Sequence, residues 1–188
     1  LMMRVLHILA LGGAGGIESL SVDVARKSLD NNFFYFLWGG GNNADKISEL
    51  TPNVEVRKFV NKNFVSEYWY FELYCKKNEI ECVIVQGVSP MMLVFATLLK
   101  IRNKKIKEVL YVHNDANYSF KDKKQKLAFK LAYKCADKCI AISQFVRNSI
   151  QETCGDCRKV HVIYNGVDTD KFQLSKPIAE ESVLRILY

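Results

Sequence analysis

One histidine and a group of glycines have the chemistry to handle an anionic substrate. His113 ends the apolar run "VLYVH", where an imidazole can hold a hydroxyl group or stabilise developing charge. The stretch "HILALGGAGGIESL" has the pattern of a strand, a glycine-rich loop and a helix start. Glycines let a ligand approach the backbone, and the free N–H groups of a helix N-terminus attract phosphate.

The glycine loop matches neither of the two common nucleotide-binding motifs. Glu18 stands where the dinucleotide fingerprint needs its third glycine, and no acidic residue ends the second predicted strand. The Gly-Lys-Ser/Thr ending of a P-loop is also missing. Two interpretations of the loop therefore remain open: it approaches a phosphate, or it is a tight turn with only a structural role.

The elements that must position these residues alternate along the chain. We predict strands at residues 4–10, 33–38, 54–59, 82–86, 108–113, 138–142 and 160–164, and helices at 17–30, 44–50, 66–78, 91–102, 121–136 and 144–153. Apolar runs without alternation, such as "CVIVQ", suit strands that are covered on both faces. This order predicts an α/β fold with a doubly wound parallel sheet of about seven strands.

The carboxyl ends of parallel strands lie along one edge of a sheet, and ligands bind there at the switch in strand order. Mostly glycines and small polar residues follow the predicted strands: Gly12, Gly13, Gly15, Gly16, Gly39, Gly40, Gly41, Gln86, Gly87, His113, Asn114, Asp115, Ser143, Gln144, Asn165 and Gly166. Turns favour such residues for structural reasons too, but this does not account for His113. His7 and His161 lie within predicted strands, so we expect them to be buried and hydrogen-bonded.

Composition indicates a globular domain with a local basic surface. The chain has 188 residues, 49% of them hydrophobic, and its most apolar stretch, 91–99, is far shorter than the roughly 20 residues of a membrane-spanning helix. The net charge is +7, and residues 101–138 carry eleven basic and four acidic side chains. Such a surface would attract phosphate, an anionic membrane or nucleic acid.

The predicted helix 121–136 carries much of this charge. It could lie on an anionic bilayer as a peripheral contact through Lys121, Lys123, Lys124 and Lys126. The alternative is an ordinary solvated lysine face over a core.

The six cysteines favour a cytoplasmic location. Four of them occur in apolar patterns, where free thiols behave as small hydrophobes: Cys75, Cys82, Cys135 and Cys139. Cys154 and Cys157 have a spacing that could bind zinc with Cys135 and Cys139, or carry redox chemistry. They fall in a short loop after a helix, so we favour two free thiols and expect no metal site.

Four segments together resemble a known family. "VIYNGVDTDKF" is similar to the segment that closes the N-terminal domain of GT-B fold glycosyltransferases, specifically the large retaining glycosyltransferase family 4. "GGIESLSVDVARKSL" resembles the first loop and helix of that family, and "YVHND" its strand ending in His-Asp. "CIAISQFVRNSI" resembles the strand, serine and helix before the last strand. The similarity covers residues 1–188 in the family's order, and it explains why Asn165-Gly166, a typical hairpin turn, has no returning strand after it.

The resemblance implies a Rossmann-like, acceptor-binding N-terminal domain over residues 1–172. Residues 173–188 would be the interdomain linker and first strand of a missing C-terminal domain that binds the donor. The implied reaction moves a sugar from a nucleotide sugar to a glycan or lipid-linked acceptor with retention, without a cofactor or an obligatory metal. We expect the full-length parent to be a cytoplasmic enzyme, and this chain alone to be inactive.

The resemblance also assigns roles to single residues. His113 resembles the histidine that sits beside the reacting sugar and is the catalytic candidate. The candidates for binding the donor phosphates or the substrate are Gly13, Gly15, Gly16, Glu18, Asn114, Ser143 and Asn165. This sequence departs from the family at Asn114, which replaces the usual Asp, and at Gln86, where a His often ends the fourth strand.

Two other classes of function remain open. A sugar-nucleotide epimerase with a GT-B-like fold would need acid/base groups at the sheet edge, for which Asp115 is the single candidate. A non-enzymatic basic module would bind a membrane or nucleic acid, but the sequence has no nucleic-acid motif, so we expect no nucleic acid.

Overall fold

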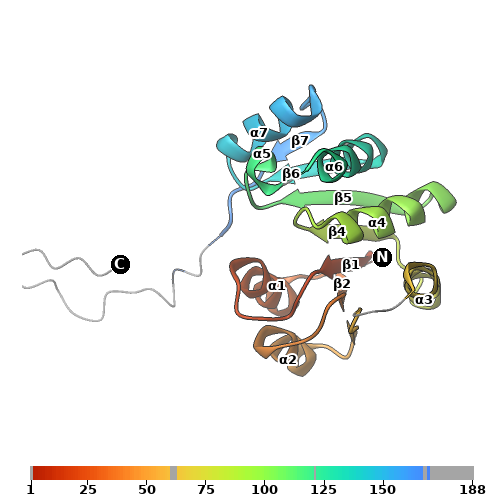
Figure 1. Ribbon diagram of the computed structural model, residues 1–188. Coiled ribbons are helices and arrows are strands. Elements are labelled where there is room, and N and C mark those ends of the chain that lie inside the picture. The colour runs from red at the N-terminus through yellow and green to blue at the C-terminus, as the bar shows by residue number, and fades with distance from the viewer. Residues whose placement is uncertain (1, 60–62, 121, 167–168, 170–188) are drawn as a thin grey trace, which may run out of the picture.

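The computed structural model describes residues 2–59, 63–120, 122–166 and 169 (Figure 1). Its strands are β1 (Arg4–Leu9), β2 (Asn31–Phe36), β3 (Val54–Val56), β4 (Cys82–Gln86), β5 (Lys107–Val112), β6 (Lys138–Ala141) and β7 (Val160–Val162). Its helices are α1 (Gly16–Lys27), α2 (Asn42–Leu50), α3 (Phe64–Lys77), α4 (Pro90–Arg102), α5 (Ala116–Ser119), α6 (Lys123–Cys135) and α7 (Gln144–Cys154). The expected linker at 173–188 lies outside the described residues.

The strands form one parallel sheet in the order β3-β2-β1-β4-β5-β6-β7. β1, β2 and β3 form one half of the sheet, with β3 at its edge. The chain then crosses back through α3, and β4 to β7 form the other half, with β4 beside β1. The strand order therefore switches between β1 and β4. This seven-stranded α/β sheet confirms the predicted fold class within the described part of the chain.

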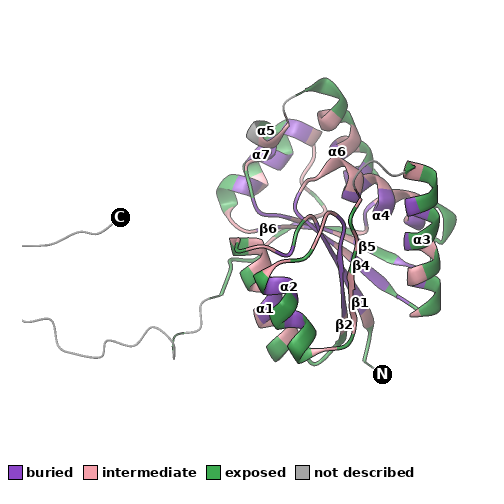
Figure 2. Ribbon diagram, turned by 60° about the horizontal axis from the view of Figure 1, so that its bottom comes forward, coloured by how far each residue is buried: buried purple, intermediate pink, exposed green. Residues whose placement is uncertain are grey.

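Helices cover the sheet on both faces because side chains alternate along each strand. On one face, α1 and α2 enclose a small core with residues such as Leu9, Phe34 and Phe36. On the other face, α3, α4, α6 and α7 enclose the larger core around Val85, Phe95 and other apolar residues. Figure 2 shows α1 and α2 on one side of the buried strands and α3 and α4 on the other.

Several predicted boundaries shift for local reasons. β2 begins at Asn31 and not at 33, because Asn31 and Asn32 pair with the start of β1. α3 begins at Phe64, two residues early, because the side chain of Asn63 accepts a hydrogen bond from the N–H group of Val65. α6 begins after 121 for the same reason, since Asp122 caps it by accepting from the N–H group of Gln125.

Two expectations at the sheet borders are wrong. β3 ends at Val56 and not at 59, because it is an edge strand that pairs with β2 alone. His161 is exposed and not buried, because β7 is the edge strand on the far side, and its ring contacts Lys138 Nζ at 3.2 Å.

The four-residue helix α5 was not predicted. Among the described residues, no helix is both long and apolar enough to cross a membrane.

Candidate functional site

A cavity of about 740 Å³ opens at the carboxyl edge of the sheet, where the strand order switches. Its walls come from the ends of β1, β4 and β5 and from the starts of α1 and α4: Ala10, Ile17, Gln86, Gly87, Val88, Ser89, Pro90, Met92, Asn114, Asp115 and Ser119. Amide, hydroxyl and apolar groups therefore line the place where open α/β sheets bind their ligands.

His113 stands behind one wall of this cavity. It is the residue after β5, it is 8% exposed, and its Nε2 lies 3.0 Å from Oε1 of the cavity residue Gln86. The ring of Tyr111 lies against it, with 4.3 Å between the ring centroids. Burial lowers the pKa of His113 from 6.5 to about 4, so its imidazole is neutral at neutral pH.

Contacts between two loops account for part of the glycine-rich sequence. The N–H group of Gly12 donates to the carbonyl oxygen of Gly39 at 3.1 Å, and Asn43 Nδ2 donates to the carbonyl oxygen of Gly13 at 2.8 Å. A Cβ atom at Gly41 would lie 2.9 Å from the carbonyl oxygen of Gly12, at a φ of 153°. Several of these glycines therefore serve close backbone packing.

The first turn of α1 is the other part of the glycine-rich segment. Gly15 is the N-cap, and Gly16 is the first helical residue. A side chain at Gly16 would enter open space, and the first N–H groups of a helix have no partner within it. The carboxylate of Glu18 folds back over Gly15, so it supplies negative charge at the positive end of the helix.

The remaining predicted site residues are spread along the sheet edge. Asn114 is exposed and lines the cavity. Ser143 is the N-cap of α7 and accepts from the N–H group of Val146 at 3.2 Å. Asn165 follows β7, and its Oδ1 accepts from the hydroxyl of Tyr111 at 3.2 Å. The structure thus joins Asn114 to the cavity, whereas Ser143 and Asn165 are not among the residues that line it.

Sequence reasoning missed how two polar residues, His7 and Asn32, connect to this site. His7 is buried and hydrogen-bonded as expected, but its partners were not foreseen: its ring nitrogens lie 3.0 Å from Asn32 Oδ1 and 3.0 Å from Gln86 Nε2. Asn32 was placed outside the second strand. The sequence shows polar residues in both strands, in "RVLHIL" and "NNFFYF", but not which of them meet.

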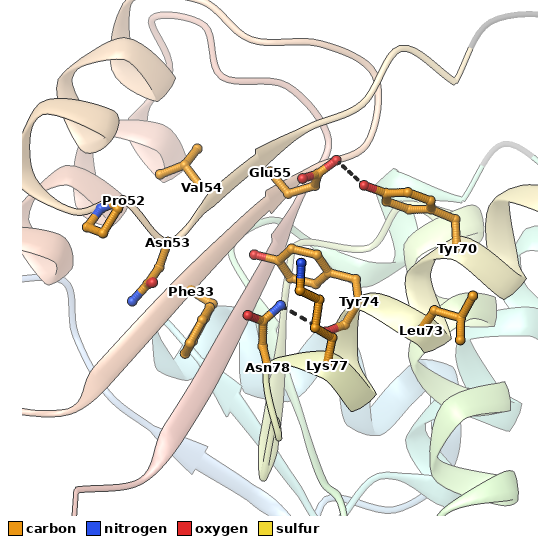
Figure 3. A pocket seen from close by; sticks show the side chains of 10 residues that line it. All are labelled: Phe33, Pro52, Asn53, Val54, Glu55, Tyr70, Leu73, Tyr74, Lys77 and Asn78. Carbon is orange, nitrogen blue, oxygen red and sulfur yellow. Dashed lines mark hydrogen bonds between the residues drawn. The ribbon is translucent and has the colours of Figure 1, made fainter.

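A second cavity, of about 510 Å³, lies near the amino ends of β2 and β3 and beside α3 (Figure 3). Phe33, Tyr70 and Tyr74 form aromatic walls, and Glu55 accepts a hydrogen bond from the hydroxyl of Tyr70 at 2.8 Å. It contains none of the predicted site residues.

The cysteines show no arrangement for a metal. Within the described ranges, no group of three or more His, Cys, Asp or Glu side chains could hold a metal ion. All six thiols are free, and Cys157 Sγ lies 3.1 Å from Arg147 Nη2.

Lysines and exposed leucines share the outer surface of α6. Lys123 and Lys124 are exposed, and Leu127 and Leu131 are 57% and 52% exposed. Leu131 also borders an apolar groove of about 290 Å³ between α4 and α6. Lys121 lies outside the described residues.

Comparison with known proteins identifies relatives of the chain. Residues 14–171 match the family described as Glycosyltransferase Family 4. The chain is 30% identical over 135 residues to an uncharacterized glycosyltransferase, MJ1069, of Methanocaldococcus jannaschii. The aligned region covers 66% of this chain and 33% of that protein. The chain thus spans about a third of the length of this curated relative.

Solved structures share the fold. Anabaena Alr3699/HepE in complex with UDP superposes with a TM-score of 0.77 at 20% identity, over 92% of this chain and 47% of that one. The same protein in complex with UDP-glucose gives a TM-score of 0.76 at 21% identity, over 92% and 46%. A UDP-N-acetylglucosamine 2-epimerase from Rickettsia bellii gives a lower TM-score of 0.58 at 12% identity, over 85% and 44%.

Proposed function

This chain belongs to Glycosyltransferase Family 4, and we propose that it is the acceptor-side domain of an enzyme that transfers a sugar, with retention, from a nucleotide sugar to a glycan or lipid-linked acceptor. The chain has the fold of the N-terminal domain of a GT-B glycosyltransferase. It spans less than half of the HepE structure, so the donor-binding domain is proposed to lie in the rest of the enzyme.

The cavity between β1 and β4 is the observation that supports this function best. Gln86, Ser89 and Asn114 offer hydrogen-bond donors and acceptors, while Ile17 and Met92 offer apolar surface. A sugar ring presents hydroxyl groups together with apolar C–H faces, so this mixture suits it. The side chains would orient an acceptor hydroxyl toward a donor held by the second domain.

His113 and the start of α1 complete the proposed arrangement. A neutral His113 is a hydrogen-bond partner for a sugar hydroxyl and contributes no fixed charge. The N–H groups at Gly16 and Ile17 would face the donor diphosphate, whose negative charge grows as the sugar leaves. We propose that no cofactor takes part and that the nucleotide sugar is a substrate.

An epimerase is less well supported by the same cavity. Proton transfer at a sugar carbon needs positioned acid and base groups. Asp115 is the single carboxylate among the described residues that line the cavity, and its Oδ1 already accepts from the N–H group of Asn117 at 2.8 Å.

We also propose that α6 holds the enzyme at an anionic membrane surface, where a lipid-linked acceptor would be found. Exposed Leu127 and Leu131 could enter the headgroup region while Lys123, Lys124 and Lys126 meet anionic lipids. The enzyme would then act at the cytoplasmic face of the membrane.

The test is a transfer assay with the full-length enzyme, a panel of nucleotide sugars, and glycan or lipid-linked acceptors. Products are detected by mass spectrometry, and NMR of the new anomeric centre reports retention. We expect His113→Ala to lower kcat/KM by roughly a hundredfold or more. His161→Ala, which removes an exposed histidine on β7, is the matched control and should leave the rate unchanged. Inversion, or full activity of His113→Ala, would contradict the proposal.

A further inference from the structure

A continuous line of hydrogen bonds crosses the sheet and ends at His113. His113 Nε2 lies 3.0 Å from Gln86 Oε1, Gln86 Nε2 lies 3.0 Å from His7 Nδ1, and His7 Nε2 lies 3.0 Å from Asn32 Oδ1. Gln86, His7 and Asn32 come from β4, β1 and β2, and His113 directly follows β5; these four strands are neighbours in the sheet. The line lies on the face of the sheet that α1 and α2 cover. Asn32 and Phe34 are two positions apart in β2, so their side chains share this face, and the ring of Phe34 stacks on that of His7 with 5.1 Å between the centroids.

A backbone carbonyl sets the direction of every bond in this line. Asn32 Nδ2 donates to the carbonyl oxygen of Asp30 at 2.9 Å, and a carbonyl oxygen can only accept. Oδ1 of Asn32 therefore faces His7, so the proton of His7 is on Nε2. The ring is neutral, because burial lowers the pKa of His7 from 6.5 to about 4, and Nδ1 of His7 then accepts from Gln86.

The same logic fixes the proton of His113. With its Nε2 directed at His7, Gln86 presents Oε1 to His113, and His113 must donate from Nε2. None of the hydrogen bonds among the described side chains uses Nδ1 of His113, and His113 is 8% exposed. Nδ1 is left as a lone pair at the carboxyl edge of the sheet.

We propose that Asn32, His7 and Gln86 are positioning residues that hold His113 neutral with its proton on Nε2, so that Nδ1 is a fixed hydrogen-bond acceptor for a sugar hydroxyl. The choice of a sugar hydroxyl rests on the proposed function. The tautomer itself rests only on the contacts across the sheet. A preset acceptor selects a ligand group that can donate, and it spares the ring a change of tautomer when the ligand binds.

The chain has three histidines, so NMR can read each ring. In the 188-residue chain labelled with ¹⁵N-histidine, two-bond ¹H–¹⁵N spectra distinguish the two neutral tautomers from the imidazolium ion. We expect His7 and His113 each to carry the proton on Nε2 at neutral pH. His161→Gln removes the third signal and assigns it. A proton on Nδ1 of His113, or a mixture of both tautomers, overturns the proposal.

Two substitutions test whether the direction is transmitted along the line. Gln86→Leu removes the direct partner of His113. Asn32→Leu removes a side chain that, of the two histidine rings, is hydrogen-bonded to His7 and not to His113. We expect both to convert His113 into a tautomer mixture, whereas a residue with only a packing role would not alter the ring proton at a distance. An unchanged His113 tautomer in either folded variant overturns the proposal.

The wild-type spectrum decides the matter even if a variant does not fold. Gln86→Glu adds an opposite test with a similar shape, because a carboxylate accepts from both rings. We expect His113 to keep its proton on Nε2 in this variant, because the carboxyl oxygen that faces it can only accept. A proton on Nδ1 of His113 there would contradict the inferred bond directions. If NMR shows the expected tautomers but the full-length enzyme transfers no sugar, the proposed function is wrong, and the inferred hydrogen-bond directions still hold.

Discussion

Glu108 is expected to make this domain less stable as the pH rises toward neutrality. Its side chain is 0% exposed on β5, and Oε1 accepts from Thr97 Oγ1 at 3.3 Å. Oε2 has no hydrogen-bond partner in the described part of the chain. Burial raises the pKa of this carboxyl from 4.5 to about 7, because the charged form cannot be solvated there.

The sign of the effect follows from this higher pKa in the folded state. Between 4.5 and 7 the folded protein keeps the proton on Glu108 while the unfolded chain has lost it. The stabilisation is therefore complete below 4.5 and is lost as the pH rises to 7. At about 1.4 kcal/mol per pH unit, the free energy of unfolding should fall by about 3 kcal/mol over this interval because of Glu108.

Urea unfolding followed by circular dichroism, at several pH values from about 4 to 8, measures this loss. Glu108→Gln keeps the shape without the charge, so it should match the parent at the acidic end and exceed its stability by about 3 kcal/mol at the basic end. Glu49→Gln, at an exposed glutamate, controls for the loss of one negative charge. A Glu108→Gln variant that gains no stability at the basic end would show that burial does not raise the pKa of Glu108.

Three further predictions concern stability and membrane contact. In thermal unfolding, Gly41→Ala should lower the free energy of unfolding by about 1–3 kcal/mol, because Gly41 has a positive φ and the carbonyl oxygen of Gly12 faces its Cβ position. Gly13→Ala, which has open space at Cβ, is the control and should lower it by under about 0.5 kcal/mol. Arg57→Met should lower the free energy of unfolding in urea by about 3–5 kcal/mol, because it removes the guanidinium that pairs with the carboxylate of Glu67, which is 3% exposed, at 2.7 Å. Leu127→Glu should weaken sedimentation with anionic vesicles by roughly tenfold or more, with neutral vesicles as the control; equal binding of both proteins would exclude α6 as the contact.

The sequence predicted the architecture because its strongest signals are local. Apolar runs such as Cys82–Gln86 are bounded by loops and separated by helical patterns, and alternation of this kind leads to a parallel sheet. The boundaries depended on weaker cues. Asn31 and Asn32 look like loop residues, and only their pairing with β1 makes them part of a strand. The exposure of His161 depends on which strands form the edges, which the pattern does not encode.

The site was less accessible to sequence reasoning because it depends on contacts between distant residues. His113 and the glycine loop could be assigned to one edge of the sheet from the strand ends alone. The bond between Gln86 and His7 spans 79 positions and exists because β1 and β4 are neighbours. Ser143 is predicted to bind the substrate, and the capping bond that its hydroxyl makes at the start of α7 is a contact that strand ends alone do not indicate.

The most direct test of the account compares the purified 188-residue chain with the full-length enzyme in the same sugar-transfer assay. Stabilisation of the departing diphosphate should require groups from both domains. We expect transfer by the full-length enzyme and none by the chain alone, although the chain should fold and show chemical-shift changes at Gln86 and Asn114 when acceptor sugars are added. Transfer catalysed by the isolated chain would contradict this expectation.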